Sequence, residues 1–339
     1  MTPNTMPLTT TIKPLGTDRV VFADHDGNIY VNSSNSLKKS ADGGNTWTTL
    51  NTFSDELVNV QETAEGHLLV LIASGELYRS DANQENFTLV YDELDAVNIY
   101  TQHLCVYDNM VFLAECASPP AKVRRIAMST DFGETWELRA SIPLPALQHI
   151  HSIQYDPYEG LLWAATGDQP TDRRIWWSDD MASSWQTHAK GSYRATNIMP
   201  FPNKVLFGSD ERHEAAVYEY ERTAKGTSGT DIQITKPWIP KKFIPDTFAS
   251  TWATIPALKF GSTPEAYFGF RQTQVQSMVP EVWKTDGEKF YLLWKHDHIP
   301  NTSPSGILGV WGPDKDNRIF ASLRTDIGAD TQHLIIISQ

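Results

Sequence analysis

Short apolar runs recur along the whole chain, and turns rich in Gly, Asp, Asn and Pro separate them. Runs of this kind between such turns are typical of β-strands, and few segments show the apolar period of a helix. The first repeat is predicted to contain four strands, at residues 19–23, 28–32, 37–40 and 46–50. We therefore predict an all-β chain built from repeated four-stranded units.

One turn sequence occurs three times between these strands, at residues 40–47, 129–136 and 178–185. The shared pattern is Ser-x-Asp-x-(Gly/Ala)-x-(Thr/Ser)-Trp, and we call these segments the Ser-x-Asp turns. A degenerate copy at residues 80–87 keeps the Ser and an aromatic residue but has a shifted Asp. A fifth copy, at residues 284–290, is one residue short.

Each position of the Ser-x-Asp turn has a structural explanation. The Asp carboxylate accepts hydrogen bonds from backbone N–H groups across a tight turn. Gly44 and Gly133 suit a backbone with positive φ, which a Cβ atom would disfavour. We therefore interpret Asp42, Asp131 and Asp180 as structural and not catalytic. A Trp begins the next strand and offers a large ring for burial; these residues are Trp47, Trp136 and Trp185.

The turns resemble the Asp-box, or BNR repeat, of sialidase-like β-propellers, and they recur at about the length of one blade, roughly 40–50 residues. The resemblance implies an all-β propeller of four-stranded blades. We count seven blades, with six as the alternative because sialidases have six. The last stretch contains only three strands, so residues 1–14 are predicted to supply the strand that closes the ring. Residues 1–339 are predicted to form one domain, with a mobile loop at 222–231.

The charge of the chain excludes some partners. It carries 28 basic and 41 acidic side chains, a net charge of −13, and no Lys/Arg-rich run. Nucleic acid and anionic membrane surfaces are therefore not expected as partners. The N-terminus lacks the basic and apolar segments of a signal peptide. No apolar run approaches the roughly 18 residues that a membrane-spanning helix requires, so we predict no membrane insertion.

The chain contains two cysteines, Cys105 and Cys116, in the two arms of one predicted hairpin. A two-residue turn at 108–109 would place Cys105 opposite residue 112 and Cys116 opposite residue 101. The two thiols would not face each other, so we predict no disulfide.

The resemblance also indicates which face binds a ligand. In Asp-box propellers the box lies between the third and fourth strands of a blade, and the functional face lies on the opposite side. Loops on that side carry Arg, carboxylate, His and aromatic side chains, which suit a sugar. The predicted ligand-binding residues are His149, Arg173, Arg194, Arg212, Trp252, Arg271 and Arg324. The candidates for catalysis are His151, Asp168, Tyr193 and Asp210.

His149 and His151 are the most distinctive pair, because strand alternation would direct both side chains to the same face. Such a pair could bind a metal or act as acid and base. No carboxylate or Cys follows at a ligand spacing, so we predict no metal site and no cofactor.

Two classes of enzymatic function are considered: a sialidase, and another carbohydrate-active enzyme, either a polysaccharide lyase or a glycoside hydrolase. A sialidase needs an arginine triad, which Arg194, Arg271 and Arg324 could imitate, but the N-terminal Arg-Ile-Pro motif of that family is absent. A polysaccharide lyase could use His151, Tyr193 and Arg194. A glycoside hydrolase needs two carboxylates about 5–10 Å apart, for which Asp168 and Asp210 are the candidates.

The third function, which we favour, is glycan recognition without catalysis. Residues 149–158 and 163–168 resemble BNR-repeat proteins of bacteria and their phages, including tail-associated ones. The expected partner is an oligosaccharide or cell-surface glycan, together with other virion proteins. The expected location is the virion, outside the cell after lysis, with the cytoplasm as the alternative.

Overall fold

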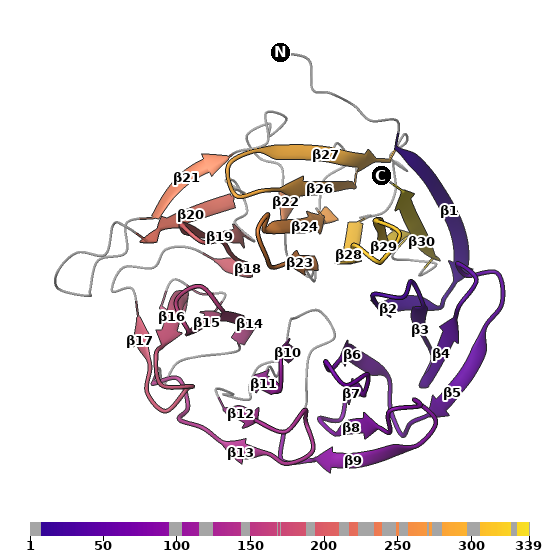
Figure 1. The fold of residues 1–339 in the computed structure, drawn as a ribbon, viewed down its shortest axis with the longest axis horizontal. Helices are drawn as coiled ribbons and strands as arrows, with labels where there is room; N and C mark the ends of the chain where they lie inside the picture. Colours follow the sequence, from indigo (N-terminus) through magenta and orange to yellow (C-terminus); the bar gives the residue numbers. More distant parts are fainter. Residues whose placement is uncertain are drawn as a thin grey trace.

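The structure is a computed structural model, and its described residues form one ring of β-sheets (Figure 1). The described residues are 8–94, 104–114, 125–143, 150–167, 169, 171–187, 194–209, 217–222, 234–238, 249–250, 257–269, 271–272, 280–296, 306–326 and 331–338. Within these ranges the regular elements are all β-strands, arranged as seven antiparallel sheets. The predicted all-β propeller is therefore confirmed, and its blade number is seven and not six.

Six blades consist of four strands each, ordered from the centre of the ring outwards. Blade 1 contains β2 (Arg19–Ala23), β3 (Ile29–Ser33), β4 (Ser36–Ser40) and β5 (Thr48–Thr52). Blade 2 contains β6 (Leu57–Glu62), β7 (Leu68–Ile72), β8 (Leu77–Ser80) and β9 (Phe87–Tyr91). Blade 3 contains β10 (Leu104–Tyr107), β11 (Met110–Ala114), β12 (Ile126–Ser129) and β13 (Glu137–Leu138).

The next three blades follow the same order. Blade 4 contains β14 (Ile150–Asp156), β15 (Leu161–Thr166), β16 (Arg174–Ser178) and β17 (Gln186–Thr187). Blade 5 contains β18 (Ala195–Pro200), β19 (Lys204–Ser209), β20 (Val217–Glu221) and β21 (Ile234–Trp238). Blade 6 contains β23 (Ala257–Lys259), β24 (Glu265–Gly269), β26 (Glu281–Thr285) and β27 (Phe290–Lys295).

Blade 7 joins the two ends of the chain. Its own segment supplies β28 (Gly306–Trp311), β29 (Arg318–Asp326) and β30 (Thr331–Ser338). The fourth strand is β1 (Thr9–Gly16), which pairs antiparallel with β30 from Thr9 opposite Ser338 to Lys13 opposite Leu334. The predicted closure by an N-terminal strand is thus confirmed. The pairing covers an edge of β30 that would otherwise expose backbone N–H and C=O groups.

Two short strands extend blade 7 on its inner side. The sheet continues from β28 to β25 (Arg271–Gln272) and then to β22 (Ala249–Ser250). Both come from the segment that also forms blade 6. The connection between β24 and β26 therefore leaves blade 6 and adds a strand to its neighbour.

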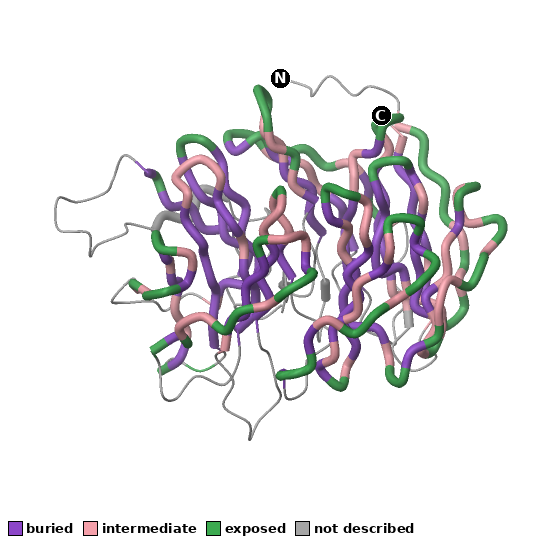
Figure 2. The backbone as a smooth tube through the Cα atoms, turned by 60° about the horizontal axis from the view of Figure 1, so that its bottom comes forward, coloured by how far each residue is buried: buried purple, intermediate pink, exposed green. Residues whose placement is uncertain are grey.

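The hydrophobic core lies between blades. All five residues of β7 and all six residues of β15 are buried, because both faces of these strands contact a neighbouring sheet. Outer strands such as β5 are largely exposed. Figure 2 shows buried segments through the inner parts of the sheets and exposed residues along the rim.

The Ser-x-Asp turns lie between the third and fourth strands of blades 1, 3 and 4. In blade 1, Asp42 Oδ1 accepts hydrogen bonds from the N–H groups of Asn45 and Thr46, both at 2.9 Å. Its Oδ2 accepts one from the Thr46 hydroxyl at 2.7 Å. Asp180 is held in the same way, and the Ser184 hydroxyl, followed by its backbone N–H, lowers the pKa of Asp180 to about 2. These ionised carboxylates hold the turns in shape.

Each of these turns also packs against the preceding blade. An added Cβ at Gly133 would lie 2.7 Å from Leu69 of blade 2, and one at Gly44 would lie 3.0 Å from Leu334 of blade 7. Ala182 replaces glycine in the third turn, is fully buried, and accepts a hydrogen bond from Ala140 N of blade 3 at 2.9 Å. The turns therefore join neighbouring blades.

The tryptophans of these turns make the same inter-blade contacts. Trp136 packs on Tyr91 of blade 2, with ring centroids 5.6 Å apart. Trp185 Nε1 donates to Ala140 O of blade 3 at 2.8 Å. The degenerate copy in blade 2 uses a polar residue for this purpose. Gln84 stands at the glycine position with a φ of 62° and directs its side chain toward blade 1.

Gln84 organises a buried set of side chains that we call the blade 1–2 polar cluster: Asp24, Tyr30, Lys39, Glu62 and Gln84. Its Nε2 donates to Glu62 Oε1 at 3.1 Å, and its Oε1 lies 2.8 Å from the Tyr30 hydroxyl. Lys39 Nζ donates to the same oxygen at 2.9 Å. Burial, followed by the negative charge of Asp24, raises the pKa of Glu62 to about 7.

A buried ion pair joins blades 4 and 5. Arg222 Nη1 donates to Asp156 Oδ2 at 2.6 Å, and Arg222 is 8% exposed. The predicted mobile loop at 222–231 therefore begins at a buried residue, and its remaining positions lie outside the described residues.

Replacing Gly133 with Ala is expected to destabilise the protein by about 2–4 kcal/mol. The φ of +81° disfavours any Cβ, and this Cβ would also collide with Leu69. Gly66→Ala is the matched control, because its φ is +84° and nothing lies within 4 Å of the added atom. Urea unfolding measures both variants. Equal losses would show that the contact with blade 2 contributes nothing.

Glu62→Gln is expected to make stability less dependent on pH. In the native protein the pKa of Glu62 is raised to about 7 from its ordinary 4.5, so the unfolded chain ionises first. The stabilising contribution of protonated Glu62 is therefore fully present below pH 4.5, and it is lost as the pH rises through about 7. The variant should gain about 1–2 kcal/mol relative to the native chain between these two pH values.

Unfolding free energies measured at about pH 4, 6 and 8 test this expectation. Glu134→Gln is the control, since Glu134 is exposed on a different turn. A native-minus-variant difference that stays constant with pH would contradict the environment assigned to Glu62.

Candidate functional site

A cavity of about 530 Å³ lies at the junction of blades 7, 1 and 2, and we call it the blade 7–1–2 cleft. Its lining comes from the β1–β2 and β3–β4 connections, the join between blades 1 and 2, and the β29–β30 hairpin. The Ser-x-Asp turns lie at the other ends of these sheets. The lining residues are Thr17, Arg19, Asn32, Ser34, Asn35, Ser54, Asp55, Glu56, Leu308, Arg324 and Gln332.

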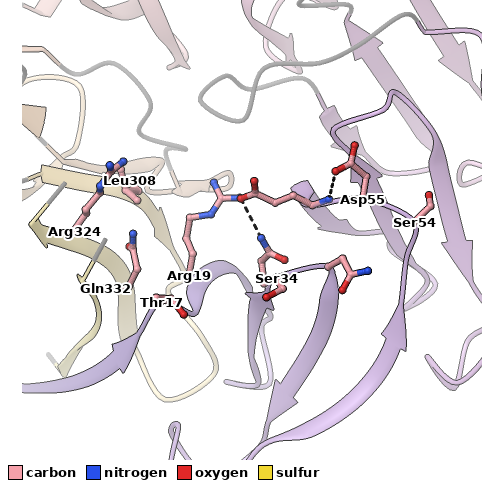
Figure 3. A pocket seen from close by; sticks show the side chains of 11 residues that line it. Thr17, Arg19, Ser34, Ser54, Asp55, Leu308, Arg324 and Gln332 are labelled. Atoms are coloured by element: carbon pink, nitrogen blue, oxygen red, sulfur yellow. Dashed lines mark hydrogen bonds and ion pairs between the residues drawn. The ribbon is translucent and has the colours of Figure 1, made fainter. Parts of the chain in front are cut away.

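Arg19 is held firmly in the middle of this cleft (Figure 3). Its Nη2 donates to Leu57 O at 2.6 Å and lies 3.6 Å from Glu56 Oε1. Asn32, which is directly opposite Arg19 in the β2–β3 register, donates to the same Glu56 oxygen at 3.3 Å. The guanidinium and the carboxylate are therefore pre-positioned by the inner strands of blade 1.

Arg324 enters the cleft from blade 7. It lies near the end of β29, opposite Gln332 of β30, and both side chains line the cavity. Gly306 pairs with Arg324 on one side and with Arg271 on the other. Strands lie about 4.8 Å apart, so the two predicted arginines occupy positions about 10 Å apart across β28. The side chain of Arg271 lies outside the described residues.

The cleft has charges of opposite sign at its two ends and an oppositely charged pair, Arg19 and Glu56, between them. Two guanidinium groups, of Arg19 and Arg324, and two carboxylates, of Asp55 and Glu56, line it. In Figure 3, Arg324 and Gln332 lie at one end, Asp55 lies at the other, and Arg19 lies between them. Leu308 is the one apolar residue among the lining residues. The cleft therefore offers a predominantly polar surface with hydrogen-bonding and charged groups.

His151 lies elsewhere, between blades 4 and 5. It is 1% exposed, and its Nδ1 is 2.8 Å from Ala195 O. A β-bulge between Ile150 and Ser152 interrupts the alternation on which its predicted direction depended. The structure thus places this residue inside the protein and away from the cleft.

Among the other predicted site residues with described side chains, Arg173 and Arg194 are not part of the cleft lining. Arg173 and Arg194 are partly buried in blades 4 and 5. Six positions lie outside the described residues: His149, Asp168, Tyr193, Asp210, Arg212 and Trp252. Among the predicted ligand-binding residues whose side chains are described, Arg324 is the one that lines the cleft.

Sequence reasoning did not identify Asp55, Glu56, Asn32 or Gln332 as site residues. Asp55 and Glu56 join blade 1 to blade 2, which is one of the two loop types that the resemblance selects. A consistent search of those joins would have found them. Arg19 was not among the predicted site residues, and its backbone partner, Leu57 O, is 38 residues away along the chain.

A second cavity, of about 590 Å³, lies at the Ser-x-Asp turn of blade 1, where Lys39, Asp42 and Gln84 are among its lining residues. No three His, Cys, Asp or Glu side chains in the described ranges form a group able to hold a metal ion. Cys105 is a buried free thiol, and burial raises its pKa to about 12. It pairs with Phe112 in the β10–β11 register, as predicted. Cys116 lies outside the described residues. A search of the described segments for a helix able to span a membrane finds none.

No family model and no curated protein matches this chain. Solved structures do match. YCF48 bound to a D1 peptide has a TM-score of 0.59 and 12% identity, over 99% of this chain and 96% of that one. The extracellular domain of the one-component system BT4673 of B. thetaiotaomicron has a TM-score of 0.60 and 12% identity, over 97% of this chain and 40% of that one. A chain of the mitotic checkpoint complex has a TM-score of 0.59 and 8% identity, over 96% of this chain and 92% of that one.

These likenesses establish the class of fold alone. The chain is a seven-bladed β-propeller, a fold compatible with binding and recognition.

His151→Ala is expected to lower stability by about 1–3 kcal/mol, because it removes a buried ring and its contact with Ala195 O. Thermal unfolding measures the loss. The exposed variant Glu134→Gln should leave the melting temperature unchanged. A fully stable His151→Ala protein would show that this contact does not hold blades 4 and 5 together.

Proposed function

We propose that this propeller recognises a saccharide in the blade 7–1–2 cleft. The observation that carries the proposal is the lining, which combines hydroxyls, amides, two guanidinium groups and two carboxylates on the face opposite the Ser-x-Asp turns. Sugar hydroxyls donate and accept hydrogen bonds, so a surface of this mixed kind suits them. The volume of about 530 Å³ is within the range of small-ligand sites, roughly 300–1,000 Å³.

Preorganisation supports binding at this place. Arg19 and Glu56 are fixed by backbone and side-chain contacts before any ligand arrives, so little side-chain entropy is lost on binding. The inner strands that carry them are rigid elements of the ring. The partner is proposed to be an oligosaccharide or cell-surface glycan. A virion or tail-associated role is the setting that the resemblance to phage proteins supports.

The alternative is a carbohydrate-active enzyme that uses the same cleft. Asp55 and Glu56 are carboxylates within the cavity, and carboxylates are the groups that glycoside hydrolysis needs. Glu56 is ion-paired with Arg19, which suits a binding role better than proton transfer. The neighbour YCF48 holds a peptide, so peptides are a competing ligand class in the test.

Arg324→Gln is expected to weaken saccharide binding at least about tenfold, since it removes a charged donor from the cleft. A glycan and peptide array identifies the ligand, and titration calorimetry measures the variant. Product analysis of the same mixtures detects any cleavage.

Glu134→Gln serves as the control on the opposite face and should bind as the native protein does. Binding that is unaffected by both Arg324→Gln and Asp55→Asn would refute the choice of cleft. Release of shorter saccharides would establish the enzymatic alternative.

A further inference from the structure

We infer that the blade 7–1–2 cleft selects a zwitterionic glycan, one that carries a carboxylate on one sugar and a protonated amine on a nearby sugar. The inference rests on the proposed saccharide function and adds the charge pattern of the ligand. Its basis is the placement of opposite charges at opposite ends of one cavity.

The central charges of the cleft largely satisfy each other. Glu56 Oε1 lies 3.6 Å from Arg19 Nη2 and accepts a hydrogen bond from Asn32. This pair lines the middle of the cleft, and its two charges cancel. Selectivity between ligands of different charge therefore falls to the residues at the two ends.

The end residues carry opposite charges. The partly buried Arg324 places a guanidinium group at the blade 7 end, and a guanidinium group suits a ligand carboxylate. Asp55 at the other end is exposed, and its Oδ1 accepts a hydrogen bond from Glu56 N at 2.7 Å. This backbone contact fixes a carboxylate in position to pair with a ligand ammonium group.

Other charge patterns fit less well. A polyanion would place carboxylates near Asp55 and would approach a chain of net charge −13. A polycation would place ammonium groups near Arg324. Like charges brought together at a binding surface disfavour the wrong partner. A neutral glycan is repelled by neither Asp55 nor Arg324, but it is also attracted by neither.

The blade 7 end of the cleft belongs to a sheet, and the Asp55 end is a short connection that leads directly into β6. Arg324 lies in the blade 7 sheet, which β1 closes, and Asp55 lies in the join to β6. The cleft can therefore discriminate by the spacing of charges along the glycan as well as by their sign.

The test compares four forms of one polysaccharide of alternating glucuronate and N-acetylglucosamine. The native polymer is anionic, and the de-N-acetylated polymer is zwitterionic. Carboxyl reduction of each gives a neutral and a cationic form. At about pH 6 the zwitterionic form is expected to bind about tenfold more tightly than the anionic and cationic forms, which each lack one charge contact, and more tightly still than the neutral form, which lacks both.

Two variants separate the two contacts. Asp55→Asn should remove the advantage of the free amine over the N-acetyl group and keep the advantage of the carboxylate. Arg324→Gln should do the reverse. Glu134→Gln is the matched control and should preserve the whole order.

The outcomes distinguish this inference from the proposed function. The inference is overturned if another charge form binds as tightly as the zwitterionic form or more tightly, and if both variants change that binding. Saccharide recognition by the cleft would then still stand. The same holds if none of the four forms binds while an array glycan binds through this cleft. If no saccharide binds, or if neither variant changes binding, the proposed function fails together with the inference.

Discussion

The pairing of β1 with β30 is the contact on which the rest of this structure depends. It joins residues from the two ends of the chain, beginning with Thr9 opposite Ser338. Seven sheets arranged in a ring bury their faces against both neighbours only if the first and last blades also meet. The same closure brings Arg324 of blade 7 beside Arg19 of blade 1. The candidate cleft therefore exists because the ring closes at this point.

Contacts between neighbouring blades hold the rest of the ring together. The Ser-x-Asp turns shape themselves through their carboxylates and pack on the preceding blade through a glycine and a tryptophan. Where the pattern has degenerated, Gln84 provides a buried polar contact instead, with Tyr30 and Glu62. A buried ion pair of Arg222 and Asp156 joins blades 4 and 5. Neighbouring blades are thus joined by apolar contacts at some positions and by buried polar or ionic contacts at others.

The candidate site was only partly predictable. Its face followed from the position of the Ser-x-Asp turns, and Arg324 was among the residues expected there. His151 was expected at the mouth of the ring, on the same strand face as His149, but it is buried next to a β-bulge that interrupts the alternation. Bulges depend on how one strand meets its neighbour, and short sequence patterns do not reveal them. The course of β25, which leaves blade 6 to pair with β28, was also not readable from the sequence.

The sequence by itself determined most of the strands and the turns between them, and it favoured seven blades over six. These features depend on contacts within a few residues, such as Asp42 with Thr46, so a local pattern carries their physical cause. Only the tertiary structure decided which loops meet and which charges share a cavity. Arg19, Glu56 and Arg324 belong to three different blades, and their distance in space depends on the closure of the whole ring. A pattern of neighbouring residues cannot encode that distance.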